Sequence, residues 1–105
     1  MVNIFQGEGK RLEFTIKEDG AVKDISSATS KKFRVVKHIG DSSYIINKDM
    51  TFSTDGTDGK IYVDLTDSDT EDLEGNYIYE VELVIGGVSY VAKVDILCVK
   101  KRAEI

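Results

Sequence analysis

The sequence predicts an all-β fold, and three observations support this prediction. Apolar and polar residues alternate with a period of two along several segments, as they do in strands with one buried face. Asp-Gly and Gly-Gly pairs, which favour tight turns, separate these segments. No segment carries apolar residues at helical spacing over any length. The 105 residues fit a single domain that spans residues 1–105.

The first half of the chain contains three expected strands, over residues 11–17, 32–38 and 43–48. The first alternates strictly and ends at an Asp-Gly turn, in which glycine accepts a positive φ without steric cost. The second alternates apolar and basic residues, and the third is the weakest of the three.

The second half begins with a polar loop over residues 53–59 and an expected strand over 60–65. Residues 66–75 are polar and acidic, and their Thr-Asp-Ser-Asp-Thr start is suited to cap one short helical turn. A long hairpin follows, with strands over 77–85 and 88–99 joined by a Gly-Gly turn. In its second strand, we expect alternate residues to share one face: Val88, Tyr90, Ala92, Val94, Ile96 and Cys98.

About seven short antiparallel strands in roughly 100 residues predict a two-layer sandwich of immunoglobulin type. The expected core is Leu12, Phe14, Ile16, Phe33, Val35, Ile61, Val63, Tyr77, Tyr79, Val81 and Leu83. The single cysteine, Cys98, cannot form an internal disulfide. Because it lies in an apolar alternation, we expect a buried, inert thiol.

The segment from Leu73 to Tyr79 resembles the corner of immunoglobulin-like domains. In that corner a tyrosine hydroxyl hydrogen-bonds to the backbone upstream, and here Gly75 and Tyr77 are the matching residues. The alternative is that Tyr77 and Tyr79 are ordinary strand residues.

The wider pattern of turns and strands is similar to the N-terminal domain of the baseplate upper protein family of phages that infect Gram-positive bacteria. It also resembles related immunoglobulin-like domains of phage head and tail proteins. The resemblance covers residues 5–99, and the matching residues are Asp19, Gly20, Asp58, Gly59, Lys60, Asp69, Thr70, Leu73, Gly75 and Tyr77.

This resemblance implies a virion structural protein: an adaptor, a capsid decoration protein, or a tail or baseplate component. Its partners would be other virion proteins, and we expect a homo-oligomer or a symmetric array in the particle. The family domain usually heads a longer chain, whereas this sequence ends soon after its last expected strand, which favours a stand-alone accessory protein.

Composition argues against several other classes. The net charge of −5 disfavours a nucleic-acid partner, because phosphate binding needs a basic face. The first residues lack the pattern of a signal peptide, and no apolar run reaches the roughly 20 residues of a membrane helix. We therefore expect synthesis in the host cytoplasm, location in the virion and no membrane partner.

The sequence predicts neither an enzyme nor a cofactor site. His38 is the only histidine, so a catalytic triad or a histidine-rich metal site would lack partners. Acidic residues gather between positions 55 and 74: Asp55, Asp58, Asp64, Asp67, Asp69, Glu71, Asp72 and Glu74. They lack the glycine and terminal glutamate of a calcium-binding hand, so we expect solvated loop acids.

Without catalytic groups, binding must come from surfaces, strand edges and termini. Val2, Ile4 and Phe5 are candidates: they either form an edge strand of their own domain or add to a neighbour's sheet. The basic residues Lys100, Lys101 and Arg102 are suited to meet the acidic 55–74 region of an adjacent copy.

The alternative function is a carbohydrate- or cell-surface-binding module. Such modules display exposed aromatic side chains, and Tyr44, Tyr62 and Tyr90 are the candidates here. The alternation places Tyr62 opposite to its inward neighbours, which makes it the best exposed of the three.

Overall fold

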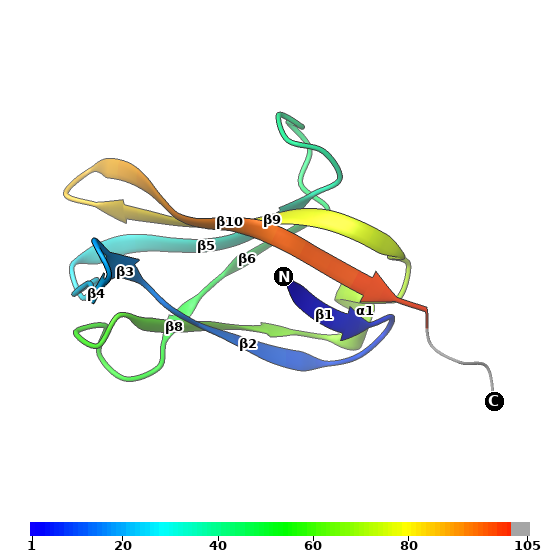
Figure 1. Cartoon of the computed structure of the whole chain (residues 1–105), viewed down its shortest axis with the longest axis horizontal. Coiled ribbons are helices and arrows are strands. Elements are labelled where there is room, and N and C mark those ends of the chain that lie inside the picture. Colours follow the sequence, from blue (N-terminus) through cyan, green and yellow to red (C-terminus); the bar gives the residue numbers. More distant parts are fainter. Residues whose placement is uncertain (102–105) are drawn as a thin grey trace.

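The structure is a computed structural model that describes residues 1–101 of the chain (Figure 1). These residues form ten strands and one helical turn in the following order: β1 (Val2–Phe5), β2 (Lys10–Thr15), β3 (Lys17–Glu18), β4 (Ala21–Val22), β5 (Ala28–Val36), β6 (Ile46–Asp49), β7 (Thr51–Phe52), β8 (Lys60–Leu65), α1 (Asp67–Thr70), β9 (Gly75–Ile85) and β10 (Val88–Lys100). The all-β class is therefore confirmed.

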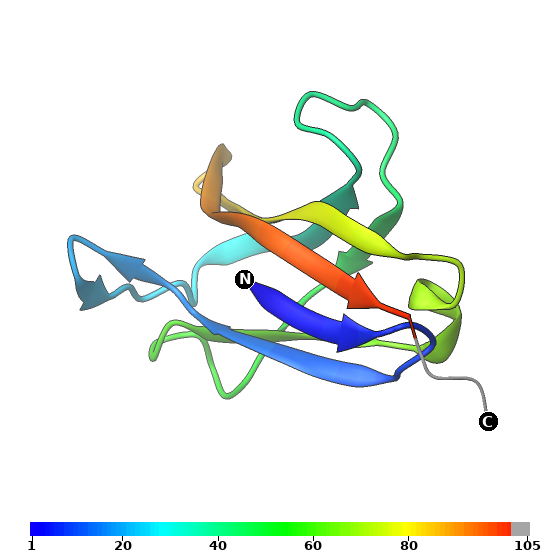
Figure 2. The same ribbon diagram turned by 45° about the vertical axis from the view of Figure 1, so that its right-hand side comes forward.

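The strands form two main sheets that face each other. A five-stranded sheet has the order β1-β10-β9-β5-β6, and a three-stranded sheet has the order β2-β8-β7. Figures 1 and 2 show the first sheet above the second, with the small β3–β4 hairpin projecting at one end.

The strand count and the wholly antiparallel order differ from the prediction. Strand β1 runs parallel to β10, so the larger sheet is mixed. The pairs β3–β4 and β7–β8 were not expected, because strands of two residues leave no readable alternation. The β3–β4 hairpin forms because Asp19 and Gly20 both adopt positive φ, as this tight turn requires.

The core lies between the two sheets, and all eleven expected core residues are buried. Phe33 and Tyr79 of the larger sheet contact Phe14 of the smaller one, with ring centroids 6.1 and 5.5 Å from that of Phe14. The core also contains residues beyond the predicted set: Ile4, Ile25, Ile46, Met50, Leu65, Leu73, Leu97 and Val99.

Strand β10 does not keep one apolar face, and the prediction for it is wrong beyond Ala92. A β-bulge shifts the register between Val91 and Lys93, so Ala92 is an extra residue. Beyond the bulge, Leu97 and Val99 are buried in the core, whereas Val94 and Ile96 are exposed. Cys98 lies on the same outer side as Ile96 and is half-buried, not buried as expected.

The expected helical turn is present as α1, and Asp69 ties it to the larger sheet. Its Oδ2 accepts hydrogen bonds from the Thr66 backbone N–H at 2.8 Å and from Lys48 Nζ on β6 at 2.7 Å. Partial burial opposes ionisation of this carboxyl, but the bonds from Lys48 and Thr66 outweigh it and lower its pKa.

We expect Asp69→Asn to lower the free energy of unfolding at pH 7 by roughly 1–2 kcal/mol, because two hydrogen bonds to a carboxylate weaken. The lowered folded-state pKa means that this stabilisation is present above the unfolded pKa, near about 4, and is lost as the pH falls through the folded value. Urea titrations of both proteins from pH 7 to pH 2 should show the difference shrinking only in the acidic range. Asp72→Asn, at an exposed acid nearby, is the control, and a gap that persists unchanged at pH 2 would contradict this account.

Tyr77 fixes the turn that enters β9. Its hydroxyl donates to the Glu74 backbone oxygen at 3.2 Å and accepts from the Glu74 N–H at 3.1 Å. Gly75, between them, has a φ of +98°, which favours glycine. The hydroxyl therefore satisfies both polar groups of one backbone residue.

Tyr77→Phe should keep the fold but lower the free energy of unfolding by about 1 kcal/mol, because the Glu74 backbone loses its partner. For a domain of this size the melting temperature would fall by roughly 4 °C. Thermal unfolding followed by circular dichroism measures the change. Tyr62→Phe is the control. Equal melting temperatures for the unchanged protein, Tyr77→Phe and Tyr62→Phe would exclude a stabilising role of the Tyr77 hydroxyl.

Candidate functional site

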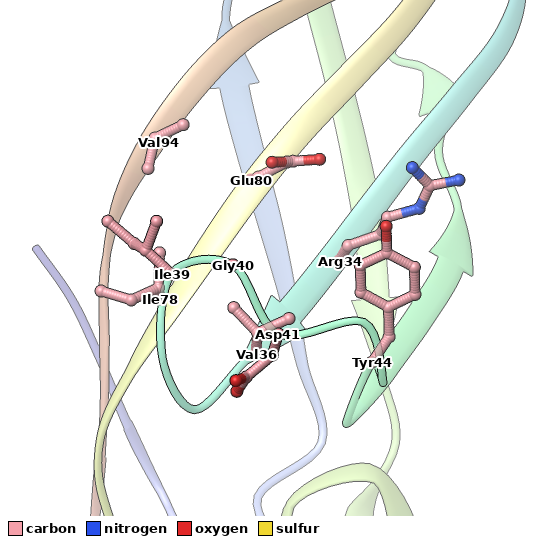
Figure 3. A pocket seen from close by; sticks show the side chains of 9 residues that line it. All are labelled: Arg34, Val36, Ile39, Gly40, Asp41, Tyr44, Ile78, Glu80 and Val94. Carbon is pink, nitrogen blue, oxygen red and sulfur yellow. The ribbon is translucent and has the colours of Figure 1, made fainter.

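A hollow lies on the outer face of the five-stranded sheet. Its volume is about 380 Å³, and Figure 3 shows how the chain between β5 and β6 arches beside it. The lining residues are Arg34, Val36, Ile39, Gly40, Asp41, Tyr44, Ile78, Glu80 and Val94.

The floor of the hollow is apolar, although it faces away from the core. Val36 and Ile78, which line the hollow, are register partners on β5 and β9. Ile96, the register partner of Ile78 on β10, continues this apolar row outside the lining of the hollow. Val94 extends this surface, and the Val94 residue itself is 53% exposed. The bulge at Ala92 produces this arrangement, because it places Val94 and Ile96 outward.

The loop over residues 37–45 forms the wall. The His38 N–H donates to Asp41 Oδ2 at 2.9 Å, and the Asp41 N–H donates to the His38 oxygen at 3.2 Å, which closes a turn. Gly40 within it has a φ of +91°. The turn presents Ile39, which is 80% exposed, beside the floor (Figure 3).

Charged groups border the apolar floor. Arg34 Nη1 forms an ion pair with Glu82 Oε1 at 2.8 Å, and its guanidinium lies 4.9 Å from the centre of the Tyr44 ring. Glu80 is the register partner of both Arg34 and Val94, so its carboxylate stands at the edge of the apolar surface. An apolar centre with a charged rim is suited to noncovalent binding.

The terminal residues that the sequence singles out lie elsewhere. Val2–Phe5 form β1, in which Ile4 is only 2% exposed and Val2 packs against the core. The segment is thus an edge strand of its own domain, the first of the two alternatives, and only Phe5 of these three is exposed. Docking through these residues stays a prediction.

The basic residues near the C-terminus begin at the end of β10, where this strand pairs with β1. Lys100 is the register partner of Phe5, and Lys101 follows it; both are exposed. Arg102 lies outside the described residues. Neither lysine lines the hollow.

The expectation that Tyr62 is the best exposed tyrosine is wrong. Tyr62 is half-buried, with the guanidinium of Arg11 3.9 Å from the centre of its ring, and Tyr90 is also half-buried. Tyr44 is the exposed one, at 43%. It does not share the burial of Ile46, because β6 starts only at Ile46 and Tyr44 belongs to the loop.

In the acidic region over residues 55–74, carboxylates accept hydrogen bonds from residues close by in the sequence. Asp55 accepts a hydrogen bond from the Thr57 N–H, and Asp58 accepts one from the Lys60 N–H. Within residues 1–101, no three His, Cys, Asp or Glu side chains gather as a metal site would require.

The hollow was not predicted from the sequence. Apolar residues at the outward positions of β5 and β9, Val36 and Ile78, were an available signal, because charged residues occupy the neighbouring outward positions. The contribution of β10 was hidden by the bulge, which reverses the inward and outward positions.

No protein-family model matches this chain, and a search of curated proteins finds no match either. In the part of the chain that the structure describes, no helix has the length and apolar character needed to cross a bilayer.

Proposed function

We propose that this chain is a noncatalytic structural protein of a bacteriophage virion, an accessory component of head, tail or baseplate that docks onto other virion proteins. The observation that carries the proposal is the apolar hollow on the outer sheet face, with Val94 and Ile39 exposed beside charged side chains. Exposed apolar patches with polar rims are typical of protein interfaces.

We further propose that the two facing sheets are a variant of the immunoglobulin-like sandwich. The Tyr77 hydroxyl bonds and the positive φ of Gly75 support it, because they match the tyrosine corner of that fold. The parallel β1 and the short strands β3, β4 and β7 are additions to the seven-stranded pattern. Such a domain, repeated as a symmetric array, is suited to a particle surface.

The direct test is the composition of phage particles purified from cells that produce this chain. We expect mass spectrometry to find the protein in gradient-purified virions at a fixed ratio to the major structural proteins. Its recovery only in the soluble lysate, with none in the particles, would refute a virion role.

Val94→Asp should reduce incorporation into particles at least tenfold, because it removes the apolar contact of Val94, and dehydrating its carboxylate in an interface costs more than about 1.4 kcal/mol. The variant should fold normally, since Val94 is exposed in the isolated domain. Val88→Asp is the matched control: Val88 is 67% exposed on the same strand and lies at the hairpin end, outside the hollow. Equal incorporation of both variants would exclude the hollow as the docking surface.

A carbohydrate- or cell-surface-binding role is the second candidate, and one observation favours it. Tyr44 is exposed at the hollow next to Arg34, Asp41 and Glu80, and an aromatic face beside polar groups is a common arrangement for sugar binding. A glycan array separates the two roles: binding that is lost in Tyr44→Ala would favour this second candidate over protein docking.

A further inference from the structure

The charge of Arg34 at the hollow is compensated within the chain. Its ion pair with Glu82 is largely shielded, with both side chains about one-fifth exposed (19% and 20%). Glu82 is itself held by Ser89, whose hydroxyl donates to Oε2 at 3.0 Å. Arg34 is therefore committed to Glu82 and offers little net charge to a ligand.

Two carboxylates at the hollow are not compensated in this way. No hydrogen bond or ion pair formed within residues 1–101 uses the Glu80 carboxylate. Asp41 is exposed, and its Oδ2 accepts only the N–H of His38. The nearby Lys37 does not reach them, because its Nζ donates to the Asn76 oxygen at 3.2 Å and lies over the Tyr77 ring. The hollow thus combines an apolar floor with an acidic rim.

From this combination, we infer that the hollow binds a segment of a partner protein that carries a lysine or arginine beside an apolar residue. The inference rests on the proposed docking function. The methylene stem of the basic side chain would lie on Ile78 and Val94, with its cationic group at Glu80. The volume of about 380 Å³ exceeds what one side chain fills, which leaves space for the apolar neighbour against Val36 and Ile39.

Charge also argues against a second copy of this chain as the occupant. A twofold interface would place the same patch against itself, so the Glu80 and Asp41 carboxylates of both copies would meet. Like charges brought together in a partly dehydrated interface oppose association. A basic partner turns the same carboxylates into attractive contacts.

The test is a titration of the ¹⁵N-labelled protein, followed by NMR, with two blocked pentapeptides, Ser-Val-Lys-Val-Ser and Ser-Val-Gln-Val-Ser. We expect both peptides to shift the amides of Ile39, Ile78, Glu80 and Val94, and the lysine peptide to bind roughly fivefold more tightly. Glu80→Gln should remove this preference, whereas the control Glu71→Gln, at an exposed acid away from the hollow, should retain it.

Equal affinity for the two peptides, no shifts at these amides up to millimolar peptide, or an unchanged preference in Glu80→Gln would overturn the inference. So would a concentration-dependent dimer in sedimentation that Val94→Asp abolishes, because the occupant would then be a second copy. If Val94→Asp blocks incorporation into particles but the peptides bind equally, the basic-residue inference fails while the docking function stands.

Discussion

Gly59→Ala is expected to lower the free energy of unfolding by at least about 3 kcal/mol, since a strained backbone and a steric clash act together. Gly59 has a φ of +71°, and a Cβ there would lie 2.8 Å from the backbone oxygens of both Ile16 and Lys23. These oxygens belong to backbone that cannot move freely: the Ile16 N–H donates to the Gly59 oxygen at 2.7 Å, and the Lys23 N–H donates to the Ile16 oxygen at 3.0 Å. The substitution must therefore push apart the junction between β8 and the β3–β4 hairpin.

Urea unfolding measures this loss, and Gly87→Ala is the matched control. Gly87 also has a positive φ, of +77°, but nothing lies within 4 Å of the position that a Cβ would take there. That variant should lose only the conformational term of about 1 kcal/mol. If the two alanine variants were equally stable, the close approach at Gly59 would be energetically unimportant.

Phe33→Ala should be the most damaging substitution in the core, with a loss of about 4 kcal/mol. Phe33 is fully buried and packs against both Phe14 and Tyr79, with ring centroids 6.1 and 5.5 Å away. Removing it leaves a cavity where the two sheets meet and ends both aromatic contacts. A domain of this kind has a total free energy of unfolding of only about 5–15 kcal/mol. The variant should therefore have a much larger fraction of unfolded molecules than the unchanged protein.

Thermal unfolding together with near-ultraviolet circular dichroism reports this loss, since the dichroism depends on fixed aromatic packing. Phe5→Ala is the control, because Phe5 is exposed at the outer edge of β1. A melting temperature for Phe33→Ala within a few degrees of that for Phe5→Ala would mean that the sheets do not depend on this contact.

Period-two alternation identified the core because it reports directly on burial. Phe14, Phe33 and Val63 lie in stretches of β2, β5 and β8 where the pairing register is unbroken, so every second residue points inward. The burial of Ile25 could not be predicted in this way. This fully buried residue lies in an irregular segment between β4 and β5, where side chains do not alternate with a period of two.

The candidate site was hidden for a different reason. One inserted residue, Ala92, reverses which side chains of β10 face water, and a bulge leaves no distinct mark in a stretch that alternates on either side of it. The hollow also needs Val36 and Ile78 in register on neighbouring strands, and pairing between strands far apart in the sequence cannot be read from local pattern.

The parallel pairing of β1 with β10 has a consequence for the order in which the strands are expected to assemble. Val2 pairs with Leu97, so this contact closes a loop of nearly the whole described chain, whereas the β9–β10 hairpin closes over two glycines. We therefore expect β1 to join after the β9–β10 hairpin has formed, because its partner β10 is the last strand to emerge from the ribosome. As an edge strand that pairs only with β10, β1 is also among the segments that we expect to open locally in the folded domain.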